Sequence, residues 1–283
     1  MVYQKKLRTC FILILWALTV IIRGQVSIDI AEYRPFPEKI MLLDLQPDML
    51  NWSIANRFLL LDKTKHELIE LGPFGDVVLS SGFGIRSQRY GELIWMGISP
   101  HGILIVDRLG NQITVLDYRL NPVTSNGLEP RIFPEHAAVD PWGRIYLYSN
   151  QYNSIFLYEG ELDQQPLIDL NRVVDIGSCL QDMEINQDGE LAILDCEGTV
   201  HIFHLLGNLR NSYPSHIRQA KFLTAVRNKW FVFNSEGNGR SVKDQEPVSI
   251  PGASIPVLDI TSMNRSIAIL ARDHILVLNV QFY

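Results

Sequence analysis

The sequence predicts an all-β protein whose short strands repeat as the blades of a six-bladed β-propeller. Six times along the 283 residues, an apolar run, a polar or Gly/Asn/Pro turn and a second apolar run follow one another. The second runs end near small or acidic residues, which lie 45, 42, 46, 39 and 37 residues apart: Asp62, Asp107, Ser149, Asp195, Asn234 and Ala271. Repeats of about 40 residues built from short strands are typical of propellers, in which each repeat forms one small sheet.

The first repeat shows how four strands fit into one period. Apolar alternation and intervening turn residues predict strands over Trp52–Ala55, Arg57–Asp62, Glu67–Leu71 and Asp76–Ser80. No stretch of the chain has the pattern of a long amphipathic helix. We therefore expect sheets alone to build the fold.

The last repeat lacks one strand. Strands are predicted over Ile260–Met263, Ile267–Ala271 and His274–Val280, and the chain ends there. At the other end, the apolar run Lys39–Leu45 belongs to no repeat. We expect this run, residues 39–45, to supply the missing outer strand, because closing the ring removes an open sheet edge.

The N-terminus predicts export. Lys5, Lys6 and Arg8 precede Cys10–Ile22, an apolar stretch of thirteen residues. A membrane span needs about 20 residues, whereas this length suits a signal peptide. Cleavage after Gly24 would release residues 25–283 as a single domain to the periplasm or the exterior. The alternative is an uncleaved signal anchor, since the residues before the cleavage point match poorly to the usual small-residue pattern.

Charge narrows the class of partner. Loss of residues 1–24 removes four basic residues and no acidic one, so the net charge changes from −6 to −10. An acidic chain without Lys/Arg clusters argues against nucleic acid or anionic lipid as the partner. We expect a monomer that binds a protein or peptide in the cell envelope, with no membrane span beyond the N-terminal segment.

Two cysteines remain after residue 24. If Gln187 and Asp188 form a two-residue turn, Cys179 and Cys196 face each other across one hairpin. Cross-strand Cβ atoms lie about 4.5–5.5 Å apart, close enough for a disulfide in an oxidising compartment. A turn placed one residue later would leave two separate thiols.

The turn and the strand that follows it in the fourth repeat carry a family resemblance. The pattern D-G-x-L-x-x-x-D-x-x-x-x-x-I over Asp188–Ile202, echoed over His101–Ile113, resembles six-bladed propellers of the NHL and TolB-like kind. The resemblance is at the level of the fold, and the fifth and sixth repeats depart from the pattern. It implies a ring with a central channel, in a broad group that includes protein-binding modules, envelope factors and metal-dependent hydrolases. Fold does not choose among these functions.

Residues just before the innermost strands should ring the channel mouth. The predicted ring consists of Asn51, Trp95, His136, Asp182, Leu223 and Asp259. Four of them, Asn51, His136, Asp182 and Asp259, could ligate a divalent cation such as Ca²⁺. The resemblance to propeller lactonases would then make the ion catalytic. The alternative is that these positions are polar because a wet channel solvates them, in which case no cofactor is needed and no catalytic residue is identified.

The same face should carry loops rich in aromatic and arginine side chains. Such side chains dominate binding energy at interfaces. The candidates for partner binding are Arg86, Arg89, Tyr90, Trp95 and Tyr152. Motifs of common hydrolases, nucleotide-binding loops and zinc sites are absent from the sequence. The sequence therefore favours a non-catalytic binding or scaffold module of the envelope, with a metal-dependent, lactonase-like hydrolase as the alternative.

Overall fold

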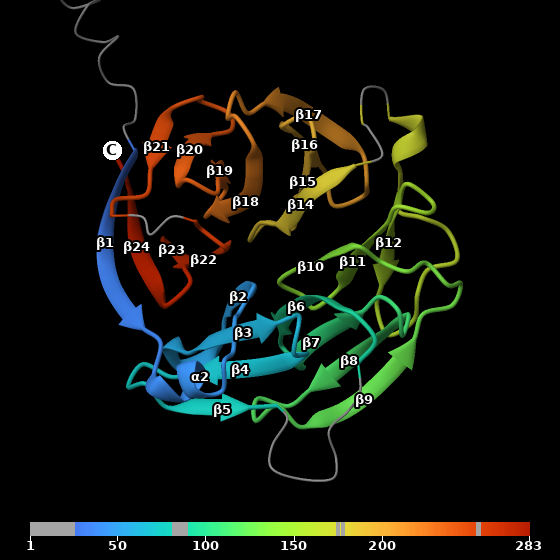
Figure 1. Ribbon diagram of the computed structural model, residues 1–283. Helices are drawn as coiled ribbons and strands as arrows, with labels where there is room; N and C mark the ends of the chain where they lie inside the picture. The colour runs from blue at the N-terminus through green and yellow to red at the C-terminus, as the bar shows by residue number, and fades with distance from the viewer. Residues whose placement is uncertain (1–25, 81–89, 174–175, 177–178, 253–255) are drawn as a thin grey trace, which may run out of the picture.

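Six four-stranded antiparallel sheets form a ring around a central axis (Figure 1). The computed structural model describes residues 26–80, 90–173, 176, 179–252 and 256–283. This architecture confirms the predicted six-bladed β-propeller. The predicted signal segment, residues 1–24, lies outside the described residues, and no helix among the described residues is long and apolar enough to cross a membrane.

Each of the first five blades takes four consecutive strands, ordered from the channel outward. Blade 1 consists of β2 (Met49–Trp52), β3 (Phe58–Asp62), β4 (Glu67–Leu71) and β5 (Val77–Leu79). Blade 2 consists of β6 (Leu93–Ser99), β7 (Gly102–Asp107), β8 (Gln112–Leu116) and β9 (Pro122–Gly127). Blade 3 consists of β10 (His136–Val139), β11 (Ile145–Ser149), β12 (Ser154–Tyr158) and β13 (Ile168–Asp169). Blade 4 consists of β14 (Leu180–Ile185), β15 (Leu191–Asp195), β16 (Thr199–Phe203) and β17 (Leu209–Pro214). Blade 5 consists of β18 (Ala220–Val226), β19 (Lys229–Asn234), β20 (Asn238–Ser241) and β21 (Pro247–Ser249).

Blade 6 joins the two ends of the chain. Its strands are β22 (Asp259–Met263), β23 (Ser266–Leu270), β24 (His274–Phe282) and, outermost, β1 (Val26–Pro35). β1 and β24 pair antiparallel from Val26↔Phe282 to Pro35↔His274. Closure of the ring by an N-terminal strand was predicted correctly.

The segment predicted to close the ring was wrong. Residues 39–45 do not form a strand; the short helix α2 (Glu38–Leu42) follows Pro37 instead. Ile40 is buried, but Met41 and Leu42 are exposed, so the apolar run does not mark a sheet position. The true strand alternates apolar and polar residues (VSIDIAEYRP), which suits an outer strand with one face in solvent.

The burial of the second strand explains why the second apolar run of each repeat is so marked in the sequence. β3, β7, β11 and β15 are buried along their whole length, because both faces of a middle strand pack against neighbouring blades. One cluster of buried apolar side chains fills the space between each neighbouring pair of blades. Strands buried on both faces read as continuous apolar runs.

In several blades the polar residue that ends the second strand is a hydrogen-bonding hub. Asp107 is 2 % exposed, and its carboxylate accepts the N–H groups of Gly91, Glu92 and Gly110 at 2.8, 2.9 and 2.9 Å. It thereby fixes both the chain that enters blade 2 and the turn after β7. Asp62 makes the corresponding contacts in blade 1, with the N–H groups of Gln46 and Lys65. The repeated residue is thus required by buried backbone groups.

A disulfide bond joins Cys179 and Cys196, whose Cα atoms are 5.5 Å apart. The turn differs from the predicted two-residue turn, since five residues separate the paired Ile185 and Leu191. A register shift between Leu180 and Asp182 moves the pairing back by one residue toward the cysteines. The β-bulge in β14 therefore brings the two cysteines opposite each other.

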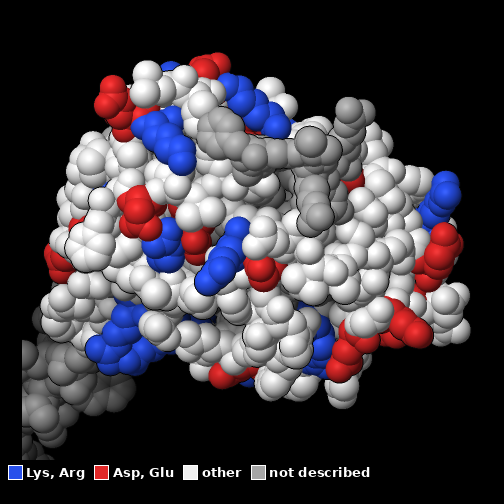
Figure 2. Space-filling view, turned by 90° about the horizontal axis from the view of Figure 1, so that it is seen from below, with Lys and Arg blue, Asp and Glu red and all other residues white. Residues whose placement is uncertain are grey.

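Charges of both signs are interspersed on the rim of the ring. Figure 2 shows the side over β5 and β9, where basic and acidic side chains alternate among large uncharged areas. Ion pairs such as Arg57–Asp76 (2.5 Å) account for part of this mixture.

Candidate functional site

A cavity of about 540 Å³ occupies the axis of the ring. Residues of all six innermost strands line it, from β2, β6, β10, β14, β18 and β22. Asp48, Lys63, Glu135 and Lys221 belong to the segments at the mouth, where the innermost strands begin. A concave pocket with convergent polar groups is the expected form of a small-ligand site.

The opposite end of the cavity is mostly apolar. Ile98, Val139 and Ile185 line it near the ends of their strands, together with the polar Ser262 of β22. Beyond them, the Gln187 side chain donates to Asn264 Oδ1 at 3.4 Å. This hydrogen bond joins the β14–β15 turn of blade 4 to the β22–β23 turn of blade 6.

Strand pairing defines which residues are equivalent at the mouth. In each blade, the equivalent residue is the one opposite the position just before the repeated residue, which is Asp62, Asp107, Ser149, Asp195, Asn234 or Ala271. These equivalent residues are Met49, Trp95, His136, Asp182, Phe222 and Asp259. The predicted ring was therefore displaced by two residues at Asn51 and by one at Leu223. Met49 pairs with Leu61, the residue before Asp62, and Phe222 pairs with Phe233, the residue before Asn234. Pairing each hairpin from these repeated residues was the sequence signal that could have found Met49 and Phe222.

The displacement in blade 1 has a local cause. The innermost strand was predicted over Trp52–Ala55, but β2 ends at Trp52 and a 3₁₀ turn follows over Ile54–Asn56. Ala55 has φ 54° and Asn56 has φ 57°, the left-handed conformation of a turn. The apolar residues Ile54 and Ala55 thus belong to the turn and not to a strand.

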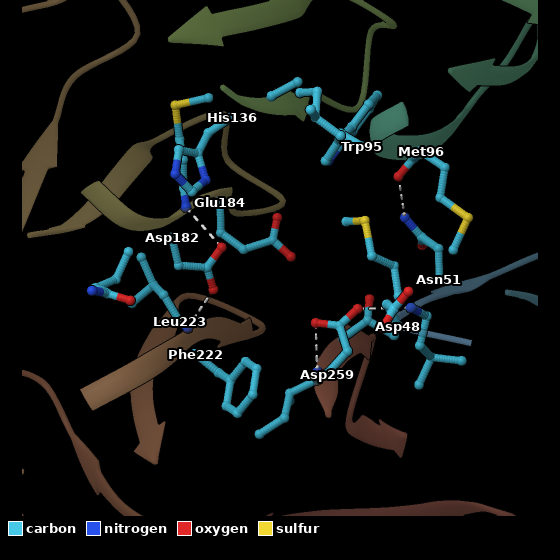
Figure 3. Close-up of a pocket in the computed structure, with 18 of the residues that line it drawn as sticks. Asp48, Asn51, Trp95, Met96, His136, Asp182, Glu184, Phe222, Leu223 and Asp259 are labelled. Carbon is cyan, nitrogen blue, oxygen red and sulfur yellow. Dashed lines mark hydrogen bonds between the residues drawn. The ribbon is translucent and has the colours of Figure 1, made fainter. Parts of the chain in front are cut away.

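Asp182 and Asp259 connect neighbouring blades. Asp182 in β14 accepts the N–H of Leu223 in β18 at 2.7 Å, and Asp259 in β22 accepts the N–H of Leu50 in β2 at 2.7 Å. The second oxygen of each carboxylate accepts the N–H of the following residue, at 2.8 Å for Met183 and 2.9 Å for Ile260. Figure 3 shows both carboxylates at the cavity wall with these bonds. Both side chains therefore have a structural role in joining the ring.

The predicted metal ligands share one cavity but do not converge as a ligand set. Among the described residues, no group of three His, Cys, Asp or Glu side chains is placed to hold a metal ion. Asn51 points its amide at the Met96 carbonyl of the next blade, at 3.4 Å. His136 makes a backbone hydrogen bond with Leu180, and burial lowers its pKa to about 4. Metal binding by these four residues stays a prediction.

Glu184 is the functional candidate that the sequence did not single out. Its side chain reaches from β14 into the cavity (Figure 3). No side chain of the described residues forms a hydrogen bond or an ion pair with it. Burial, followed by repulsion from Asp182, raises its pKa to about 8. Burial also raises the pKa of Asp182 to about 6 and that of Asp259 to about 7. Three carboxyl groups thus share a wall in which negative charge is poorly compensated.

Replacement of Glu184 by Gln should make the protein more stable at high pH. The folded protein holds the Glu184 proton up to about pH 8, whereas the unfolded chain loses it near the ordinary value of 4.5. The glutamate therefore lowers the free energy of unfolding as pH rises from about 4.5 to 8. Urea denaturation should show Glu184→Gln gaining on the order of 2–4 kcal/mol over the wild type at pH 9. The gain should vanish near pH 4.5, and a difference that does not change with pH would contradict the assignment.

The five predicted partner-binding residues have different environments. Arg86 and Arg89 lie outside the described residues. Tyr90 packs against the apolar cluster between blades 1 and 2, and burial raises its pKa to about 12. Trp95 lines the cavity, while Tyr152 is 42 % exposed and packs edge-on to Phe156, beside a separate hollow of about 290 Å³ on blade 3. Of the three partner-binding candidates that the structure describes, only Trp95 lines the axial cavity.

Comparison with known proteins supports the fold. No family model and no curated protein matches the chain. Among solved structures, virginiamycin B lyase from Staphylococcus aureus has a TM-score of 0.60 and 11% identity, covering 90% of this chain and 99% of that one. YCF48 bound to D1 peptide has a TM-score of 0.59 and 12% identity, covering 83% and 78%. The Pan2 WD40 domain of Neurospora crassa has a TM-score of 0.55 and 10% identity, covering 88% and 79%.

A lyase, a protein bound to a peptide and a WD40 domain are thus similar in fold to this chain. At 10–12% identity, they show that the chain is a β-propeller and do not transfer an activity or a partner.

Proposed function

We propose that this protein is a non-catalytic, exported propeller that binds a peptide segment of a protein partner at the channel mouth. The axial cavity is the observation that carries the proposal. It is large enough for several side chains, and its mouth combines Asp48, Glu135, Lys63 and Lys221 with the aromatic Trp95 and Phe222. Aromatic and charged groups around a concave surface suit peptide recognition.

Two further features support a binding role. Asp182 and Asp259, which could serve as catalytic acids, have both oxygens engaged by backbone N–H groups. The Cys179–Cys196 disulfide is consistent with an oxidising compartment and hence with export. YCF48 bound to D1 peptide offers a propeller precedent for a peptide ligand.

Selection from a displayed peptide library against the purified protein tests the proposal. We expect enrichment of a shared sequence motif whose binding weakens at least tenfold in the mouth variant Trp95→Ala. The matched control is Trp142→Ala, which removes the same side chain from an exposed turn on the opposite face. A peptide whose affinity falls equally in both variants, or failure to enrich any motif, would reject binding at the mouth.

A further inference from the structure

We propose that the axial cavity takes a cationic group of the peptide partner, a lysine or N-terminal ammonium, held among Asp182, Glu184 and Asp259. This inference rests on the proposed function and names the chemistry that the cavity recognises. It starts from the cavity itself, which lies on the axis, opens beside the starts of the innermost strands and holds a deeply placed carboxyl group aimed into its centre (Figure 3).

Glu184 points to a ligand because its carboxyl group is left without a compensating charge. The backbone N–H of Ile185 donates a hydrogen bond to it, and the charges that act on it are those of Asp182 and Asp259. Charged groups that are largely shielded from bulk water are usually paired in proteins. An ammonium ion that entered the cavity would supply the missing partner.

The other charged groups around the cavity are arranged at its mouth. Lys221 lowers the pKa of Asp182, and Lys63 lowers that of Asp259, but burial outweighs both effects. Lys63 and Lys221 are exposed, as is Asp48, while Glu135 and His136 are half-buried. The basic groups thus compensate the two aspartates in part and leave Glu184 to a ligand.

The walls suit an organic cation better than a metal ion. No three His, Cys, Asp or Glu side chains of the described residues form a metal-binding group. Trp95 and Phe222 line the cavity, and aromatic faces attract ammonium groups and also contact the methylene chain that carries them. A volume of about 540 Å³ accommodates a lysine side chain with room for adjoining backbone.

The experiment compares N-acetyl-lysine methylamide with N-acetyl-norleucine methylamide by calorimetric titration of the full chain. The lysine compound should bind once per protein, at least tenfold more tightly than the norleucine compound at pH 8. Equal affinity for both compounds would overturn the proposal, as would displacement of the lysine compound by Ca²⁺ at equal stoichiometry.

Two variants separate this inference from the proposed function. Glu184→Gln, which removes the carboxylate aimed into the cavity and keeps the shape of the side chain, should weaken the lysine compound at least tenfold. Lys221→Gln should strengthen it about twofold, because it removes a competing positive charge near Asp182. A library-selected peptide that binds at the mouth but is indifferent to Glu184→Gln would overturn the cationic site and leave the proposed function standing.

Discussion

Deletion of residues 26–35 should abolish cooperative folding. These residues form β1, the outer strand of blade 6, which pairs with β24 from Val26↔Phe282 to Pro35↔His274. Without them β24 presents an open edge, and the apolar cluster between blades 5 and 6 loses Val26 and Ile28 from its outer side. A domain of ordinary stability has only about 5–15 kcal/mol to lose, and we expect this deletion to remove most of it. Thermal unfolding followed by circular dichroism should show no sharp transition.

Deletion of residues 1–25 is the matched control for this experiment. It removes a longer segment but leaves β1 in place, so the unfolding transition should stay within a few degrees of the wild type. A synthetic peptide of residues 26–35 should restore a transition to the β1-deleted protein, because an extended peptide can add to an exposed sheet edge. An unchanged transition after loss of β1 would show that the ring closes without it.

Replacement of Asp107 by Ala should destabilise the protein by about 3 kcal/mol or more. The carboxylate of Asp107 is almost fully buried and accepts three backbone N–H groups. Each buried donor left without an acceptor costs about 1–3 kcal/mol. The loss should appear as a lower urea midpoint without a change in slope, since the surface exposed on unfolding is the same.

Asp117 provides the control for Asp107. Its carboxylate also accepts backbone N–H groups, those of Arg119 and Asn121, both at 2.8 Å, but in a turn that solvent reaches. Water can satisfy these donors after Asp117→Ala, so the expected cost is below about 1 kcal/mol. Equal losses in the two variants would show that burial does not determine the effect.

The features that sequence predicted well are those imposed by local burial. Asp62, Asp107 and Asp195 recur because the turn after the second strand needs an acceptor for its backbone N–H groups in each of these three blades. The apolar runs before them recur because middle strands are buried on both faces. Both requirements act within a few residues of chain. They therefore leave a periodic record that can be read without the structure.

The features that sequence predicted poorly depend on distant contacts. Residues 39–45 are apolar enough for a strand, but the edge of β24 is taken by Val26–Pro35, a choice decided at the other end of the chain. Asn51 was misplaced for a local reason, because Ile54 and Ala55, although apolar, form a turn. Glu184 lies two residues from Asp182 on β14, but the other blades bury it and bring Asp259 to the same cavity, and burial is the main cause of its raised pKa.

The hydrogen bond between Gln187 and Asn264 tethers the turns of two blades that are not neighbours in the ring. Both side chains are exposed and the bond is 3.4 Å long, so it costs little to break and does not by itself close the channel. The bonds that Asp182 and Asp259 accept from adjacent blades at the mouth are shorter, at 2.7 Å. The mouth is therefore the more firmly braced end of the ring, and a ligand bound there meets a rim that is largely preorganised before it arrives.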